Sequence, residues 1–111
     1  MPIRRGDVIA VAAPGDYGKP RPAVIVQSDA FPESHDSIVV CQMTSLLIDD
    51  VDFRVTIEPS SANGLRLRSQ VMVDKPIAIR RRRIGRPIGH LAAEEMTRLD
   101  VALAFVMGLA G

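Results

Sequence analysis

Arg21 and Thr44 are the residues of this 111-residue chain whose types and positions suggest chemistry. Arg21 stands just before the apolar run 23–26 (AVIV), and Thr44 and Ser45 follow a second apolar run, 37–43 (SIVVCQM). A guanidinium presents a planar fork of donors that suits phosphate oxygens, and a hydroxyl can donate and accept hydrogen bonds. If the two runs are strands of one sheet, these groups meet at one rim, and a phosphodiester is the ligand that they favour.

The same residues also fit a purely structural interpretation. Arg21 could be a rim arginine that pairs with Asp16 or Asp74, and Thr44 could cap a turn at the end of its strand. Chemistry alone does not choose between this interpretation and a phosphodiester site.

Metal and disulfide chemistry are not expected. Cys41 is the single cysteine, which excludes an intramolecular disulfide, and its place in an apolar run favours a packed thiol. A single cysteine fits a reducing, cytoplasmic setting. His35 and His90 have no second ligand at the spacing of a zinc motif. We therefore expect no metal and no cofactor.

Arginine is distributed unevenly, although the net charge is only +1. Seven arginines fall within residues 66–86, and four of them form the run 80–83, so a basic face is a possibility. The run either forms a solvated edge that discourages pairing with other strands, or contacts the phosphates of a nucleic acid.

Apolar patterns and breakers predict one domain over 1–111 built of short strands. Strands are predicted over 7–12, 21–27, 37–43, 53–57 and 69–73, with a closing turn at 74–76, an extended stretch at 77–79 and a short edge strand at 87–88. We also expect Phe31-Pro32 to anchor a short helical turn to the core.

The hydrophobic period changes to that of a helix over about residues 92–109. Its last turns, from Val101, are apolar nearly all round, and a partner subunit is a natural cover for them. Strands followed by one late helix predict a mainly β fold, a small SH3-like antiparallel barrel with a C-terminal helix. The N-terminal run is too short for a signal peptide and the C-terminal run too short to span a bilayer, so no membrane contact is expected.

Five segments, in order, resemble the MazF/PemK family of toxin endoribonucleases from bacterial toxin–antitoxin modules. They are RRGDVIAV (4–11), GKPRPAVIVQSDAF (18–31), VVCQMTS (39–45), NGLRLRSQVMVDKPIAI (63–79) and GHLAAEEMTRLDVAL (89–103). The resemblance covers nearly the whole chain. It departs from the family at Gln42, where a proline is common, and at Met72, where some members carry a second arginine.

The resemblance implies an RNA-cleaving site. It puts the family's catalytic arginine on Arg21, its strand-end hydroxyl on Thr44 with Ser45 beside it, and its acid on Asp74. The family cleaves single-stranded RNA without a metal, by attack of the 2′-OH, to give a 2′,3′-cyclic phosphate and a 5′-OH. Arg21 and Thr44 would then stabilise the phosphorane, and Asp74 would be the base or would hold Arg21 in place.

Further RNA contacts are expected around this rim. Lys19 and Tyr17 belong to the turn-rich loop 13–20, a lid candidate, and Ser45 lies beside the catalytic hydroxyl. A further arginine of the family falls on Arg82 or Arg83, because the run of four leaves the register open.

The expected partners are single-stranded mRNA, a cognate antitoxin and a second copy of the chain, with DNA reached only indirectly through the antitoxin. Two other functions remain open on the same barrel. One is a CcdB-like toxin that binds gyrase and cuts nothing, and the other is a catalytically silent RNA-binding module. Incubation with long RNA in EDTA distinguishes the three.

Overall fold

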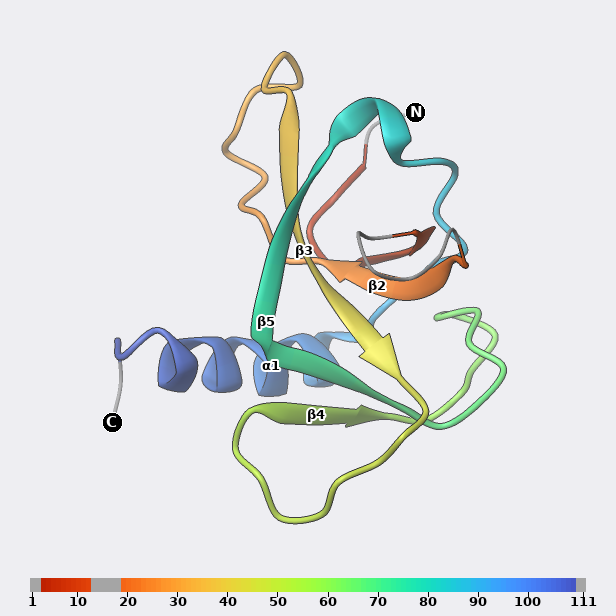
Figure 1. Ribbon diagram of the computed structural model, residues 1–111, viewed down its shortest axis with the longest axis vertical. Helices are drawn as coiled ribbons and strands as arrows, with labels where there is room; N and C mark the ends of the chain where they lie inside the picture. The colour runs from red at the N-terminus through yellow and green to blue at the C-terminus, as the bar shows by residue number, and fades with distance from the viewer. Residues whose placement is uncertain (1–2, 13–18, 110–111) are drawn as a thin grey trace.

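The computed structural model describes residues 3–12 and 19–109. In these residues the chain forms six strands, a 3-10 turn and one α-helix (Figure 1). The elements are β1 (Asp7–Val11), β2 (Arg21–Ile25), β3 (Ser37–Thr44), β4 (Arg54–Ile57), β5 (Ser69–Arg80), η1 (Arg81–Arg83), β6 (Gly89–His90) and α1 (Ala93–Val106). The predicted fold class, mainly β and antiparallel with a C-terminal helix, is confirmed.

The strands form one sheet in the order β4-β5-β3-β2-β1-β6, and every neighbouring pair is antiparallel. The sheet curls because β5 bends sharply halfway along its length (Figure 1). Its first half pairs with β4 and the end of β3, and its second half pairs with the beginning of β3. The result is a curled half-barrel.

The bend in β5 corrects a prediction, because the sequence suggested that Asp74-Lys75-Pro76 ends a strand. On the β3 side, Cys41 pairs with Pro76 and Met43 with Val71, so residues 72–75 face only Gln42 of that strand. Proline within a sheet is tolerated at such a bulge, where the ladder of hydrogen bonds is already interrupted. The strand therefore turns a corner at 72–75 and continues to Arg80.

The two edges of the sheet approach each other through a pair of glycines. The amide of His90 donates to the carbonyl of Ala62 at 2.9 Å. A Cβ at Gly64 would lie 2.3 Å from the carbonyl oxygen of Ile88, so only glycine permits this contact. The edge strand consequently forms at 89–90, two residues later than predicted, because Val8 pairs with Gly89.

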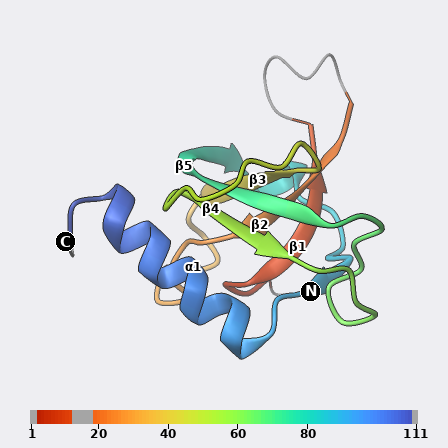
Figure 2. The ribbon, with the colours of Figure 1, turned by 90° about the horizontal axis from the view of Figure 1, so that it is seen from below.

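Helix α1 packs on β4 and β5 beside the sheet (Figure 2). It is shorter at its C-terminal end than the predicted 92–109, since Gly108 takes a left-handed conformation (φ 71°) that ends the helix. The carboxylate of Glu95 accepts from the amide of Ala92 at 2.7 Å, in place of the hydroxyl cap that the sequence lacks. No helix in the described residues has the length and apolar character needed to cross a bilayer.

Only one face of α1 is covered. Leu99 and Ala102 are buried, whereas Val101 is 67% exposed and Phe105 50% exposed. The expectation that the last turns are apolar on more than one side is confirmed, and a large apolar surface is left at this end of the chain.

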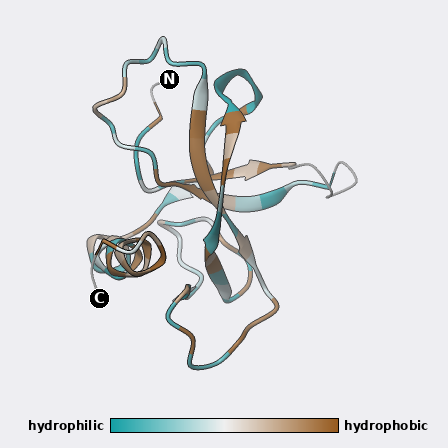
Figure 3. Cartoon of the chain, turned by 60° about the vertical axis from the view of Figure 1, so that its left-hand side comes forward, coloured by the Kyte–Doolittle hydropathy of each residue, from teal (hydrophilic) through white to brown (hydrophobic). Residues whose placement is uncertain are grey.

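The central strands are largely hydrophobic (Figure 3), and their buried residues divide between two core clusters. Val24 belongs to one core cluster, while Ala23 and Ile25 belong to a second cluster on the other face. This strand is therefore buried on both faces. The expected anchor at Phe31 is wrong: its side chain is 46% exposed, its ring lies against that of His35, and residues 28–36 form turns without a helix.

Candidate functional site

The register of β2 and β3 brings Arg21 and Thr44 together. Ala23 pairs with Gln42, and the same register carried two residues further sets Arg21 opposite Thr44. Because side chains alternate along a strand, both point to the face shared by Ala23 and Gln42. Directly opposite residues have Cβ atoms roughly 5 Å apart. The two strands thus share a sheet, and the guanidinium and the hydroxyl meet at one rim.

These residues line a pocket of about 470 Å³ at the ends of the strands, which we call the Arg21 pocket. Its polar side chains include Lys19, Arg21, Thr44, Ser45 and Arg66. Four residues predicted for the site are therefore neighbours, and Arg66 joins them. Tyr17, also predicted, lies outside the described residues.

The hydroxyl of Thr44 is held in a defined orientation. Its Oγ1 accepts a hydrogen bond from the amide of Leu46 at 3.1 Å. A hydroxyl that accepts in this way still has its own hydrogen to donate. Thr44 can therefore donate to an anionic oxygen in the pocket, while Ser45 beside it is exposed.

Gln70 fixes the corner that follows Thr44. It lies opposite Thr44 on β5, is 5% exposed, and its amide bonds both the N–H and the carbonyl of Ile48, at 3.0 and 2.9 Å. Nη1 of Arg54 donates to the same amide at 3.2 Å and to the carbonyl of Leu46 at 3.3 Å. Sequence reasoning did not single out these two residues. The only signal in the sequence was that each is a polar residue inside a predicted strand, Gln70 in 69–73 and Arg54 in 53–57.

Arg54 lies next to one of the positions at which the chain departs from the family pattern. It pairs directly with Met72, the position at which some members carry a second arginine. A guanidinium therefore lies beside that position, on the neighbouring strand. Its Nε is buried and has no hydrogen-bond partner among the described residues.

Asp74 does not line the Arg21 pocket. It lies at the corner of β5, where its carboxylate pairs with Lys75 at 2.7 Å. The hydrogen bond from Lys75 lowers the pKa of Asp74 below its ordinary 3.8, with a smaller contribution from the charge of Arg54. The carboxylate is therefore ionised at neutral pH.

The arginine run lies at the other end of β3. Arg80 pairs with Ser37, seven residues from Thr44, a separation of about 23 Å along a strand. Arg80 forms an ion pair with Asp36 at 3.2 Å, and Nε of Arg81 donates to the carbonyl of His35 at 3.0 Å. The first half of the run thus holds the connection between β2 and β3.

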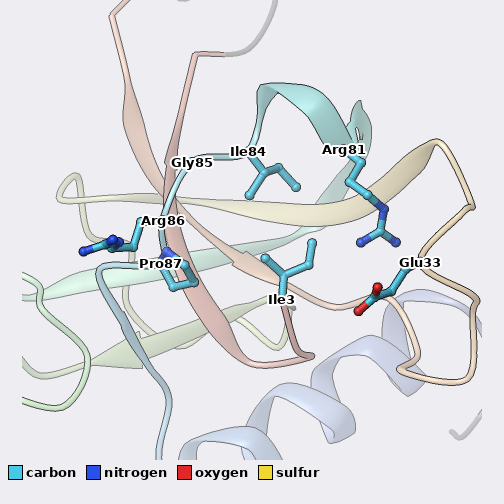
Figure 4. Close-up of a pocket in the computed structure, with 7 residues that line it drawn as sticks. All are labelled: Ile3, Glu33, Arg81, Ile84, Gly85, Arg86 and Pro87. Atoms are coloured by element: carbon cyan, nitrogen blue, oxygen red, sulfur yellow. The ribbon is translucent and has the colours of Figure 1, made fainter. Parts of the chain in front are cut away.

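Arg82 and Arg83 are exposed and are not brought to the Arg21 pocket. Beside them, Arg81 and Glu33 point toward each other at one side of a second pocket of about 660 Å³, which Ile3 and Ile84 also line (Figure 4). The arginines of residues 66–86 therefore do not form a single face. Arg66 lies at the Arg21 pocket, whereas Arg81 and Arg86 line this second pocket.

Comparison with known proteins identifies the family of the chain. A model of the PemK-like, MazF-like toxins of type II toxin–antitoxin systems matches residues 4–107. The chain is 40% identical over 110 residues to a probable endoribonuclease MazF of Mycolicibacterium smegmatis, covering 98% of this chain and 100% of that protein. It is 28% identical over 116 residues to endoribonuclease MazF9 of Mycobacterium tuberculosis, covering 96% and 98%.

Solved structures share the fold. A mycobacterial endoribonuclease in complex with its cognate antitoxin superposes with a TM-score of 0.83 at 21% identity, covering 99% of each chain. The Mycobacterium tuberculosis toxin MazF-mt6 superposes with a TM-score of 0.79 at 24% identity, covering 96% of this chain and all of the other.

Proposed function

The chain belongs to the PemK-like, MazF-like toxin family of type II toxin–antitoxin systems, and on that premise we propose that it is an endoribonuclease that cleaves single-stranded RNA. The observation that carries the proposal is that Arg21 and Thr44, at the ends of two neighbouring core strands, line one pocket. Lys19 and Ser45 line the same pocket, so the pocket offers cationic and hydroxyl donors to one phosphate.

The proposed reaction is transfer of the phosphodiester to the neighbouring 2′-oxygen. The 2′-OH attacks phosphorus and loses its proton, the bond from phosphorus to the 5′-oxygen breaks, and that oxygen takes up a proton. The products are a 2′,3′-cyclic phosphate and a 5′-OH. Such a reaction needs donors to the phosphorane oxygens and groups that accept and supply the protons.

Arg21 and Thr44 supply the donors in this proposal. The guanidinium of Arg21 binds two phosphorane oxygens through its fork, and the hydroxyl hydrogen of Thr44 bonds another. The backbone of each residue is fixed by a core strand, so the donors need little rearrangement as charge develops. This type of preorganised stabilisation contributes the most to many enzymatic rates.

For Asp74 we propose an electrostatic role in preference to that of proton acceptor. Its lowered pKa makes the carboxylate a weak base, and its side chain pairs with Lys75 outside the pocket. A negative charge at the corner of β5 would instead act on the site electrostatically, as in the second role that the resemblance implied, that of holding Arg21 in place.

We also propose two protein partners. The exposed apolar residues of the last helical turns, Val101, Phe105, Met107 and Leu109, would be covered by a second copy of the chain. A cognate antitoxin would block the Arg21 pocket, in line with a complex of that kind among the similar structures. DNA would be reached only through the antitoxin, and the setting would be the cytoplasm.

Cleavage of long RNA in the presence of EDTA tests the enzyme. We expect fragments that end in a 2′,3′-cyclic phosphate, identified by mass spectrometry. A chimeric oligonucleotide with deoxyribose on the 5′ side of the cut should resist cleavage, because it lacks the nucleophile. Cutting of that chimera would rule out the 2′-OH mechanism, and cutting only after addition of a divalent metal would rule out metal independence.

A further inference from the structure

Three exposed apolar side chains surround the cations of the Arg21 pocket. Leu46 is 79% exposed, Leu67 63% and Ile88 44%, and all three line this pocket. A single exposed leucine is ordinary on a protein surface. Here three come from three different segments and converge on one pocket, and we call them the apolar wall. Such a gathering beside charged groups indicates a binding surface.

Hydrogen bonds fix the backbone at each residue of the wall. The amide of Leu46 donates to Thr44, and its carbonyl accepts from Arg54. The hydroxyl of Ser69 donates to the carbonyl of Leu67 at 2.9 Å. The amide of Ile88 donates to a carbonyl of β1 at 2.8 Å. These side chains are therefore presented outwards by a backbone that is not free to fold them inwards.

The loop that carries Leu67 is also fixed at its base. Asn63 is fully buried, and its Oδ1 accepts from the amides of Ser60 and Leu65, both at 3.0 Å. Its Nδ2 donates to the carbonyl of Glu58 at 2.8 Å. On the opposite side of the pocket, the amide of Gln70 holds the corner with Leu46. A wall preformed in this way loses little conformational entropy when a ligand binds.

We propose that the apolar wall is a subsite for a nucleobase of single-stranded RNA, next to the phosphate held by Arg21. The proposal rests on the proposed function, since it takes single-stranded RNA as the ligand. The same pocket contains three cationic side chains, Lys19, Arg21 and Arg66, which favour an anionic ligand. The wall favours a ligand that has an apolar surface attached to that anion. A nucleotide unit carries a phosphate and a base within a few ångströms of each other.

The aliphatic character of the wall determines how the base is bound. The described residues that line the pocket include no aromatic side chain, so the base packs on methyl groups. Such contacts exclude water from a base face without reading its edge, because every base has an apolar face. The wall accordingly contributes affinity and orientation for the splayed base, and little choice among the four bases.

The test measures binding of two non-cleavable probes. One is a pool of short 2′-O-methyl oligoribonucleotides of random sequence, and the other has the same backbone without bases. Leu46→Ser and Leu67→Ser should each weaken binding of the first probe about tenfold, because a leucine contact with the base is lost. Both variants should bind the abasic probe as the wild-type protein does, with the same dependence on salt concentration, since no phosphate contact changes.

Leu47→Ser is the matched control, since Leu47 lies in the same loop, is 42% exposed and does not line the pocket. It should bind both probes as wild type. The proposal is overturned if the Leu46 and Leu67 variants keep the wild-type preference for the probe with bases, or if the wild type has no such preference. The wall would then be interpreted as a binding surface for a protein partner instead of a nucleobase. A wild type that prefers bases but cuts no RNA would refute the endoribonuclease and leave the subsite intact.

Discussion

The two ends of strand β3 both carry arginine, and they use it differently. At the Ser37 end, Arg80 and Arg81 bond the connection that leads into the strand, through Asp36 and the carbonyl of His35. At the Thr44 end, Arg21 and Thr44 line an open pocket instead. The first two arginines of the dense run serve the fold, and the candidate site lies at the other end, where Arg21 and Arg66 come from separate segments.

The difference shows that charge density along a chain does not locate a site. A run of arginines follows one path and its members point in several directions, so they reach different neighbours. Arg21 and Thr44 are 23 residues apart, yet antiparallel pairing makes them neighbours on two rigid strands. Donors fixed by separate core strands converge on one oxygen more readily than donors that share one flexible turn.

The largest effects are expected at the Thr44 end. Arg21→Ala and Thr44→Ala should each lose about tenfold to a thousandfold in the single-turnover cleavage rate, because each removes a donor to the phosphorane. Arg21→Lys should recover little, since an ammonium cannot reproduce the bidentate fork. A folded Arg21→Ala protein with the wild-type rate would contradict the assignment.

Charge reversal at the two ends sharpens the comparison. Arg66→Glu should weaken binding of short RNA and reduce the slope of log affinity against log salt by about 0.7, as expected for one lost phosphate contact on a single strand. Arg82→Glu and Arg83→Glu should leave short RNA unaffected and weaken only long RNA, because they lie at the far end of β3. Titrations with short and long RNA at several salt concentrations measure both. If all three variants weakened the binding of short RNA equally, the two ends of β3 would not differ in their contact with RNA.

Asp74→Asn should lower the cleavage rate less than tenfold, since the carboxylate lies at the corner of β5 and outside the pocket. The lowered pKa of Asp74 also means that its pair with Lys75 stabilises the fold above pH 3.8, its ordinary value, and that this stability is lost as the pH falls further. A rate loss as large as that of Arg21→Ala would restore Asp74 to the role of base.

Cys41 lies in the middle of β3 and reports on the strand between the two ends. Burial, with a smaller contribution from the charge of Asp74, raises the pKa of its thiol from 9.0 to about 11, so the folded protein should resist thiol reagents at pH 8. The thiol ionises at a lower pH in the unfolded chain than in the folded protein, so ionisation favours unfolding at high pH. The free energy of unfolding is therefore unaffected by this thiol below pH 9, and falls by roughly 3 kcal/mol as the pH rises through 11.

Slow labelling of Cys41 in the variants at either end would also establish that β3 is intact in them. Rapid labelling in any variant would mean that its loss of activity reflects a damaged strand, and that variant would no longer bear on the comparison.

The sequence by itself determined the mainly β fold, the late helix and the positions of Arg21 and Thr44 at the ends of core strands. Each depends on local patterns, an apolar run bounded by turn residues or a change of hydrophobic period, which neighbours along the chain dictate. The resemblance of the five segments to the family added the catalytic roles that we propose.

Only the tertiary structure decided what lies around these residues. The continuation of β5 through Pro76 depends on a bulge against β3, and the division of the arginines between two ends depends on how the sheet curls. Arg54, Gln70 and the apolar wall come from segments far apart in sequence, so no local pattern connects them. Their association follows from strand register and loop packing, which are fixed by contacts between distant parts of the chain.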